Sequence, residues 1–83
     1  MTKPSNDLQD STKIEYRIEG KIVEKDTFEK LTSNWQEIEG SYHCAKTTDG
    51  GRNSFEAIDS NGITWIYRCI MKGNFTSYSA DKR

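Results

Sequence analysis

Hydrophobic and polar positions alternate through much of the second half of the chain. Residues 42–78 hold four short segments, mostly rich in aromatic and β-branched side chains. Three turn sequences separate these segments: Asp49-Gly50-Gly51, Asp59-Ser60-Asn61-Gly62 and Lys72-Gly73-Asn74. Short strands separated by turns at these intervals predict an antiparallel β-meander.

Turn length predicts which residues face each other across the strands. With Asp49-Gly50 as a two-residue turn, His43 faces Glu56. A three-residue turn in the second hairpin then places Ala57 opposite Trp65. Both alignments put the same residues on one face: Tyr42, Cys44, Phe55, Ala57, Ile63, Trp65, Tyr67, Cys69 and Met71. Because a slip of one residue would reverse every side chain, this agreement supports the register.

The first half of the chain predicts a strand, a turn and a helix. Residues 14–18 alternate between apolar and charged side chains, and Gly20-Lys21 suits a two-residue turn. Asp26 is a good N-cap, and Glu29 stands where a capping box places its carboxylate. An apolar stripe at helical spacing follows, formed by Phe28, Leu31 and Trp35. We expect this stripe to be core and to cover the aromatic face of the sheet.

These elements together predict an α+β fold, in which one α-helix packs on an antiparallel β-sheet of about five strands. The order is a β-hairpin and helix followed by the β-meander. A chain of 83 residues suits one domain rather than two, and we expect that domain to span residues 13–80. Residues 1–12 are predicted to be a disordered polar lead-in, and residues 81–83 a short basic tail.

Charge and hydropathy narrow the classes of partner. The net charge of −1 gives no strong attraction to nucleic acid or to an anionic membrane. Mean hydropathy is −0.90, and no apolar run approaches the roughly 18 residues of a membrane span. Residues 1–12 lack the apolar segment of a secretory signal, although a signal removed upstream of Met1 stays open.

The two cysteines bear on the compartment. Cys44 and Cys69 lie on strands that the predicted middle strand separates, so their Cα atoms should be at least roughly 10 Å apart. A disulfide requires less than about 7 Å. We therefore predict two free, largely buried thiols and a cytoplasmic protein. If the two strands were neighbours instead, a disulfide and a secreted protein would become plausible.

The sequence carries no motif of catalysis or of metal or cofactor binding. His43 and Cys44 are adjacent on a strand, so they point to opposite faces and cannot bind one metal ion. The predicted pair of His43 and Glu56 lacks a nucleophile and an oxyanion loop. We expect no enzyme activity, no catalytic residue, no metal site and no cofactor.

The other face of the meander is the predicted site of function. Isoleucines lie there among polar residues, and an apolar centre with a polar rim is typical of an interface. We expect a small non-catalytic protein-binding or inhibitory module, of the immunity-protein or antitoxin type. The predicted partner-binding residues are His43, Glu56, Ile58, Ile66, Arg68 and Ile70.

Three alternatives remain open from the sequence. The same face could join two copies in a homodimeric assembly protein, or the chain could bind a small molecule. The isoleucines could also merely reflect strand propensity, or the N-terminal segment could fold over them. If this face were core, the acidic surface around Glu15, Glu19 and Glu24 would be the interface. Nucleic acid is not expected, because this face shows one firm cation and the aromatic residues fall on the other face.

Overall fold

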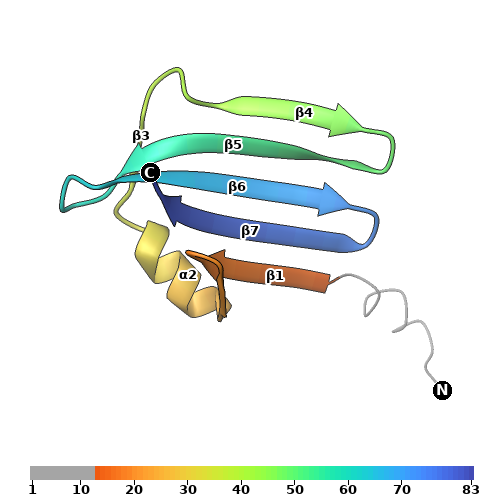
Figure 1. The fold of residues 1–83 in the computed structure, drawn as a ribbon, viewed down its shortest axis with the longest axis horizontal. Coiled ribbons are helices and arrows are strands. Elements are labelled where there is room, and N and C mark those ends of the chain that lie inside the picture. Colours follow the sequence, from red (N-terminus) through yellow and green to blue (C-terminus); the bar gives the residue numbers. More distant parts are fainter. Residues whose placement is uncertain (1–12) are drawn as a thin grey trace.

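A computed structural model describes residues 13–83 and shows one mixed β-sheet with a short helix packed against it (Figure 1). The helix is α2 (Lys25–Thr32). The strands are β1 (Lys13–Ile18), β2 (Lys21–Val23), β3 (Gln36–Glu37), β4 (His43–Thr47), β5 (Gly50–Ile58), β6 (Thr64–Lys72) and β7 (Phe75–Lys82). Their order across the sheet is β2-β1-β7-β6-β5-β3, and β4 pairs with β5 beside β3. Residues 1–12, predicted to be a disordered lead-in, lie outside the described residues.

The prediction of an antiparallel sheet of about five strands is wrong. The sheet has seven strands, and β1 runs parallel to β7, with Lys13 opposite Phe75 and Ile18 opposite Ala80. Alternation of apolar and polar residues marks a half-buried strand in either orientation, so the pattern in β1 could not show a parallel neighbour. The last strand also continues to Lys82, into the segment expected to be a basic tail.

The register of one predicted hairpin of the meander is confirmed, and that of the other is wrong. Pairing of β5 with β6 is as predicted, with Ala57 opposite Trp65. Pairing of β4 with β5 is shifted by two residues, so His43 lies opposite Ser54 and not opposite Glu56. The shift is an even number of residues, so each side chain keeps its predicted face.

The shifted pairing places Gly50 inside β5, where its backbone lies close to β6. The β4–β5 turn is formed by Thr48 and Asp49, and Gly50 already belongs to β5. A Cβ atom on Gly50 would lie 2.0 Å from the carbonyl oxygen of Met71 on β6. Glycine is therefore required here for strand packing and not for a turn with positive φ.

Two smaller predictions near the N-terminus are also wrong. The β1–β2 turn is formed by Glu19 and Gly20, whose φ angles are 51° and 85°, and not by Gly20-Lys21. Helix α2 follows Glu24 as its N-cap and has no side-chain cap hydrogen bond, so Asp26 lies in the first turn. An acidic residue there is still favourable, because the helix N-terminus carries partial positive charge.

The core lies between α2 and one face of the sheet, which we call the inner face. Phe28, Trp65 and Ala80 are buried at its centre, and the partly buried side chains around them are Tyr16, Ile18, Val23, Leu31, Trp35, Tyr67 and Tyr78. The predicted stripe of Phe28, Leu31 and Trp35 is thus confirmed as core. Trp35 follows the end of α2 and stacks on Trp65, with ring centroids 5.5 Å apart.

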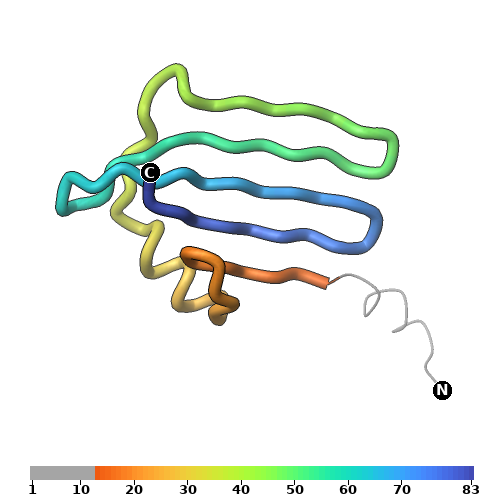
Figure 2. The backbone as a smooth tube through the Cα atoms, in the orientation of Figure 1, coloured from red at the N-terminus to blue at the C-terminus, as the bar shows by residue number. Residues whose placement is uncertain are grey.

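The helix covers only one end of the inner face. Figure 2 shows α2 beside the end of the sheet where β5 leads into β6, while the β4–β5 and β6–β7 hairpins extend beyond it. Both cysteines are free, as predicted, and Asn53 of β5 lies between them in the pairing. Cys69 is buried, but Cys44 is exposed because no helix reaches β4, so the prediction that both thiols are buried is wrong for Cys44.

Candidate functional site

The six predicted partner-binding residues lie on the face of the sheet opposite α2, which we call the outer face. They occupy alternate positions of β4, β5 and β6, so they share this face. The structure brings Glu56 opposite Ile66 and Ile58 opposite Thr64. It separates His43 from Glu56, since the residue opposite His43 is Ser54.

Two ion pairs border Ile66 on the outer face. Ile66 lies opposite Glu56 on one side and opposite Asp81 on the other. The Arg83 guanidinium donates to the Glu56 carboxylate, and an Arg68 nitrogen lies 3.7 Å from an Asp81 oxygen. Ile66 is therefore half-buried between two ion pairs. The result is an apolar centre with a polar rim.

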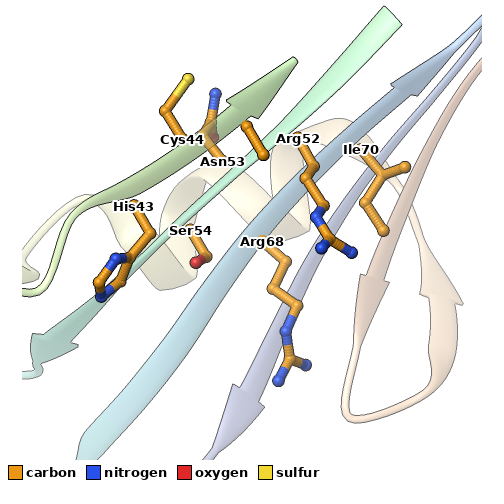
Figure 3. Close-up of a pocket in the computed structure, with 8 residues that line it drawn as sticks. His43, Cys44, Arg52, Asn53, Ser54, Arg68 and Ile70 are labelled. Atoms are coloured by element: carbon orange, nitrogen blue, oxygen red, sulfur yellow. The ribbon is translucent and has the colours of Figure 1, made fainter. Parts of the chain in front are cut away.

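Beside this centre the outer face carries a hollow of about 300 Å³, formed by β4, β5 and β6. It is lined by His43, Cys44, Ala45, Arg52, Asn53, Ser54, Arg68 and Ile70. Figure 3 shows Ser54 between His43 and Arg68, while the side chains of Cys44 and Asn53 point away from these three. The last two residues thus border the hollow mainly with their backbone.

The strand pairing explains why the surface is hollowed at this place. One row across the three strands reads His43, Ser54, Arg68, and the next reads Ala45, Arg52, Ile70. In the first row the small Ser54 lies between two longer side chains, and in the second row the small Ala45 lies on β4 beside Arg52. This relief depends on the observed register, because the predicted one would have placed Glu56 opposite His43.

The hollow is cationic. Arg52 and Arg68 are both exposed, and none of residues 13–83 that line the hollow is acidic. Glu56, two positions along β5 from Ser54, is engaged by Arg83. Arginine guanidinium groups bind carboxylate and phosphate through paired N–H donors, so the hollow can bind an oxyanion.

Arg52 is the residue that the sequence-based prediction missed. It has the same parity on β5 as Ser54 and Glu56, so simple alternation already assigns it to the outer face. The prediction of one firm cation on this face is therefore wrong. Arg17 of β1 adds a further cation beside Glu15, because it lies opposite Ser79, which lies opposite Arg68.

Three side chains on the inner face have raised pKa values. Burial raises the pKa of Tyr67 to about 12, with a smaller effect from the nearby Cys69. Burial likewise raises the pKa of Tyr78 and of Cys69. These shifts follow from packing against the core, and they keep all three groups neutral at physiological pH.

Within residues 13–83, no three or more His, Cys, Asp or Glu side chains are grouped to hold a metal ion. No helix in this part of the chain is long and apolar enough to cross a membrane. A comparison of the chain with protein-family models, curated proteins and solved structures found no match, so the functional argument rests on the outer face itself.

Proposed function

We propose that this chain is a small non-catalytic protein-binding module that acts through the outer face of its sheet, as an immunity protein or antitoxin does. One observation supports the proposal most. Isoleucines are exposed on this face beside the cationic hollow, with Ile58 at 41% and Ile70 at 44% exposure. Helix α2 packs on the inner face, so it does not cover them.

The outer face has the chemical composition that protein interfaces require. Ile66 and Ile70 flank Arg68 on β6, so apolar and cationic groups alternate along one strand. Arginine beside apolar groups is enriched at the centres of interfaces, where it combines packing with directed hydrogen bonds. Strand pairing fixes the backbone of these residues, so no backbone ordering is needed on binding.

The free thiols suit a reducing compartment, and we place the protein in the cytoplasm on that ground. A homodimer through the same outer face is the second candidate. A small-molecule ligand fits the site less well, because the hollow lies at the small end of the range for ligand pockets, roughly 300 to 1,000 Å³.

A matched pair of variants tests the proposal. Ile70 and Met71 are neighbours on β6 with exposures of 44% and 42%, and they point to opposite faces. Ile70→Glu should reduce capture of the protein partner from cells of the source organism after cross-linking. Met71→Glu should leave capture unchanged. Equal capture by both variants, with folding confirmed by circular dichroism, would contradict an outer-face interface.

Light scattering after size exclusion, at several concentrations, separates a foreign partner from self-association. A monomer at all concentrations supports a foreign partner. A mass that doubles with concentration, and that Ile70→Glu returns to the monomer value, would establish the homodimer instead.

A further inference from the structure

We propose that the cationic hollow binds the carboxylates of an acidic segment on the protein partner. This inference rests on the proposed function and specifies the chemistry of the partner. The residues that carry it are Arg52 and Arg68, assisted by His43 and Ser54 on the same outer face.

The two guanidinium groups are placed to act together. Arg68 lies opposite Ser54, and Arg52 lies opposite Ile70, so the arginines are diagonal neighbours on β5 and β6. Diagonal positions on paired strands are roughly 7–8 Å apart, within reach of long side chains. In Figure 3 both arginine side chains extend on the same side of the sheet, with Ser54 near Arg68. Two carboxylates of one segment, or one bridging carboxylate, match this spacing.

Within residues 13–83, Arg52 forms no ion pair, and Arg68 is paired only with Asp81 at the edge of the hollow. The lining holds two arginines and a histidine but no acid. The contact of Arg68 with Asp81 is long, 3.7 Å, and its side chains are 51% and 39% exposed. An exposed pair of this kind contributes little to stability, so a partner carboxylate can replace Asp81 at small cost.

The surroundings favour an acidic protein segment over a nucleic acid. Sheet surfaces that bind single strands place aromatic rings among the cations. The rings of β5 and β6, Phe55, Trp65 and Tyr67, lie on the inner face. Phe75 of β7, opposite Lys72, lies on the outer face but does not line the hollow. Apolar Ile70 and Ala45 line the hollow instead. The methylene groups of a glutamate side chain can pack against them while its carboxylate reaches an arginine.

A labelled peptide of six glutamates is the direct probe, with binding measured by fluorescence anisotropy at low ionic strength. The variant Arg52→Gln/Arg68→Gln should weaken binding by about tenfold or more, because it removes both charge-assisted contacts. The control is Lys21→Gln/Lys46→Gln, which removes the same charge from exposed positions outside the hollow. It should change binding less than about twofold, since only the general field of the protein is altered.

Each alternative gives a different result. Equal losses in both double variants would mean that the peptide senses only overall charge, and would overturn the proposal. Tight binding of a single-stranded oligonucleotide, lost in Arg52→Gln/Arg68→Gln, would assign the hollow to nucleic acid. Binding of inorganic phosphate by calorimetry, without binding of the peptide, would assign it to a small anion and again overturn the proposal.

Capture of the partner separates this inference from the proposed function. If Ile70→Glu abolishes capture but Arg52→Gln/Arg68→Gln does not, the outer face is the interface and the acidic segment is wrong. If neither variant affects capture, the proposed function itself fails. The proposed function and this inference are both supported if both variants lose capture of the partner and Arg52→Gln/Arg68→Gln also loses binding of the glutamate peptide.

Discussion

The indole Nε1 of Trp65 donates a hydrogen bond to the Asp59 Oδ2 at 2.9 Å, which fastens the β5–β6 turn to the core. The other carboxylate oxygen of Asp59 accepts hydrogen bonds from the backbone N–H groups of Asn61 and Ile63, at 2.8 and 2.9 Å. One side chain thus satisfies three donors and fixes the turn that aligns Ala57 with Trp65. These bonds favour the charged carboxylate and lower the pKa of Asp59 below its ordinary 3.8.

Asp59→Asn should destabilise the protein at neutral pH and much less in acid. A lowered pKa in the folded state means that ionised Asp59 stabilises the fold fully above its unfolded pKa. That contribution is lost as the pH falls below 3.8 and through the folded pKa. Thermal melting of both proteins at pH 7 and at about pH 3 should therefore show a gap that narrows in acid. A gap of constant size would show that the amide, and not the charge, determines the difference.

Trp65→Ala should cost about 3 to 5 kcal/mol of unfolding free energy, since it removes a large buried side chain. Trp65 is only 4% exposed and packs against Phe28 and Ala80. In a domain of this size the loss approaches the whole stability. Part of the Trp65→Ala protein should therefore already be unfolded before urea is added. Ile63→Ala, in the same hairpin at 38% exposure, is the control and should melt close to the wild type. A Trp65→Ala protein as stable as this control would place Trp65 outside the core.

The two thiols should react at very different rates. Cys44 is exposed, whereas Cys69 is buried and its pKa is raised by burial, which lowers its thiolate fraction. Alkylation of the folded protein without reductant should add one group by intact mass, and alkylation in denaturant should add two. Cys44→Ser should abolish the first modification. No modification in denaturant would reveal a disulfide and require another strand order.

Side-chain alternation predicted faces well, because the period of two depends only on residues within one strand. It placed Trp65 and Tyr67 with the core, and His43, Arg68 and Ile70 on the outer face. The six predicted binding residues accordingly share one face. What they bind is a proposal, and the alternation alone does not address it.

Strand neighbours were harder to predict, because they depend on contacts between distant parts of the chain. The parallel pairing of β1 with β7 joins residues about sixty positions apart and has no local signal. The hollow also escaped prediction. It requires Ser54 between His43 and Arg68. The Asp49-Gly50 sequence predicted a different β4–β5 register, in which Ser54 does not face His43.

Gly50→Ala tests the register on which the hollow depends. The added methyl group would meet backbone atoms of β6, with the Met71 carbonyl oxygen at 2.0 Å and its carbon at 2.7 Å. Backbone atoms of a paired strand cannot move aside without breaking ladder hydrogen bonds, so we expect a loss of at least about 2 kcal/mol by urea unfolding.

Gly73→Asn is the matched control for Gly50→Ala at the neighbouring turn. Gly73 has a φ of 57°, nothing lies within 4 Å of a Cβ added there, and its N–H donates to the Asp49 carbonyl. Asparagine tolerates this conformation, so the cost should stay below about 1 kcal/mol. If Gly50→Ala is instead as stable as Gly73→Asn, Gly50 belongs to the turn. His43 would then face Glu56, and the row of His43, Ser54 and Arg68 that shapes the hollow would not form.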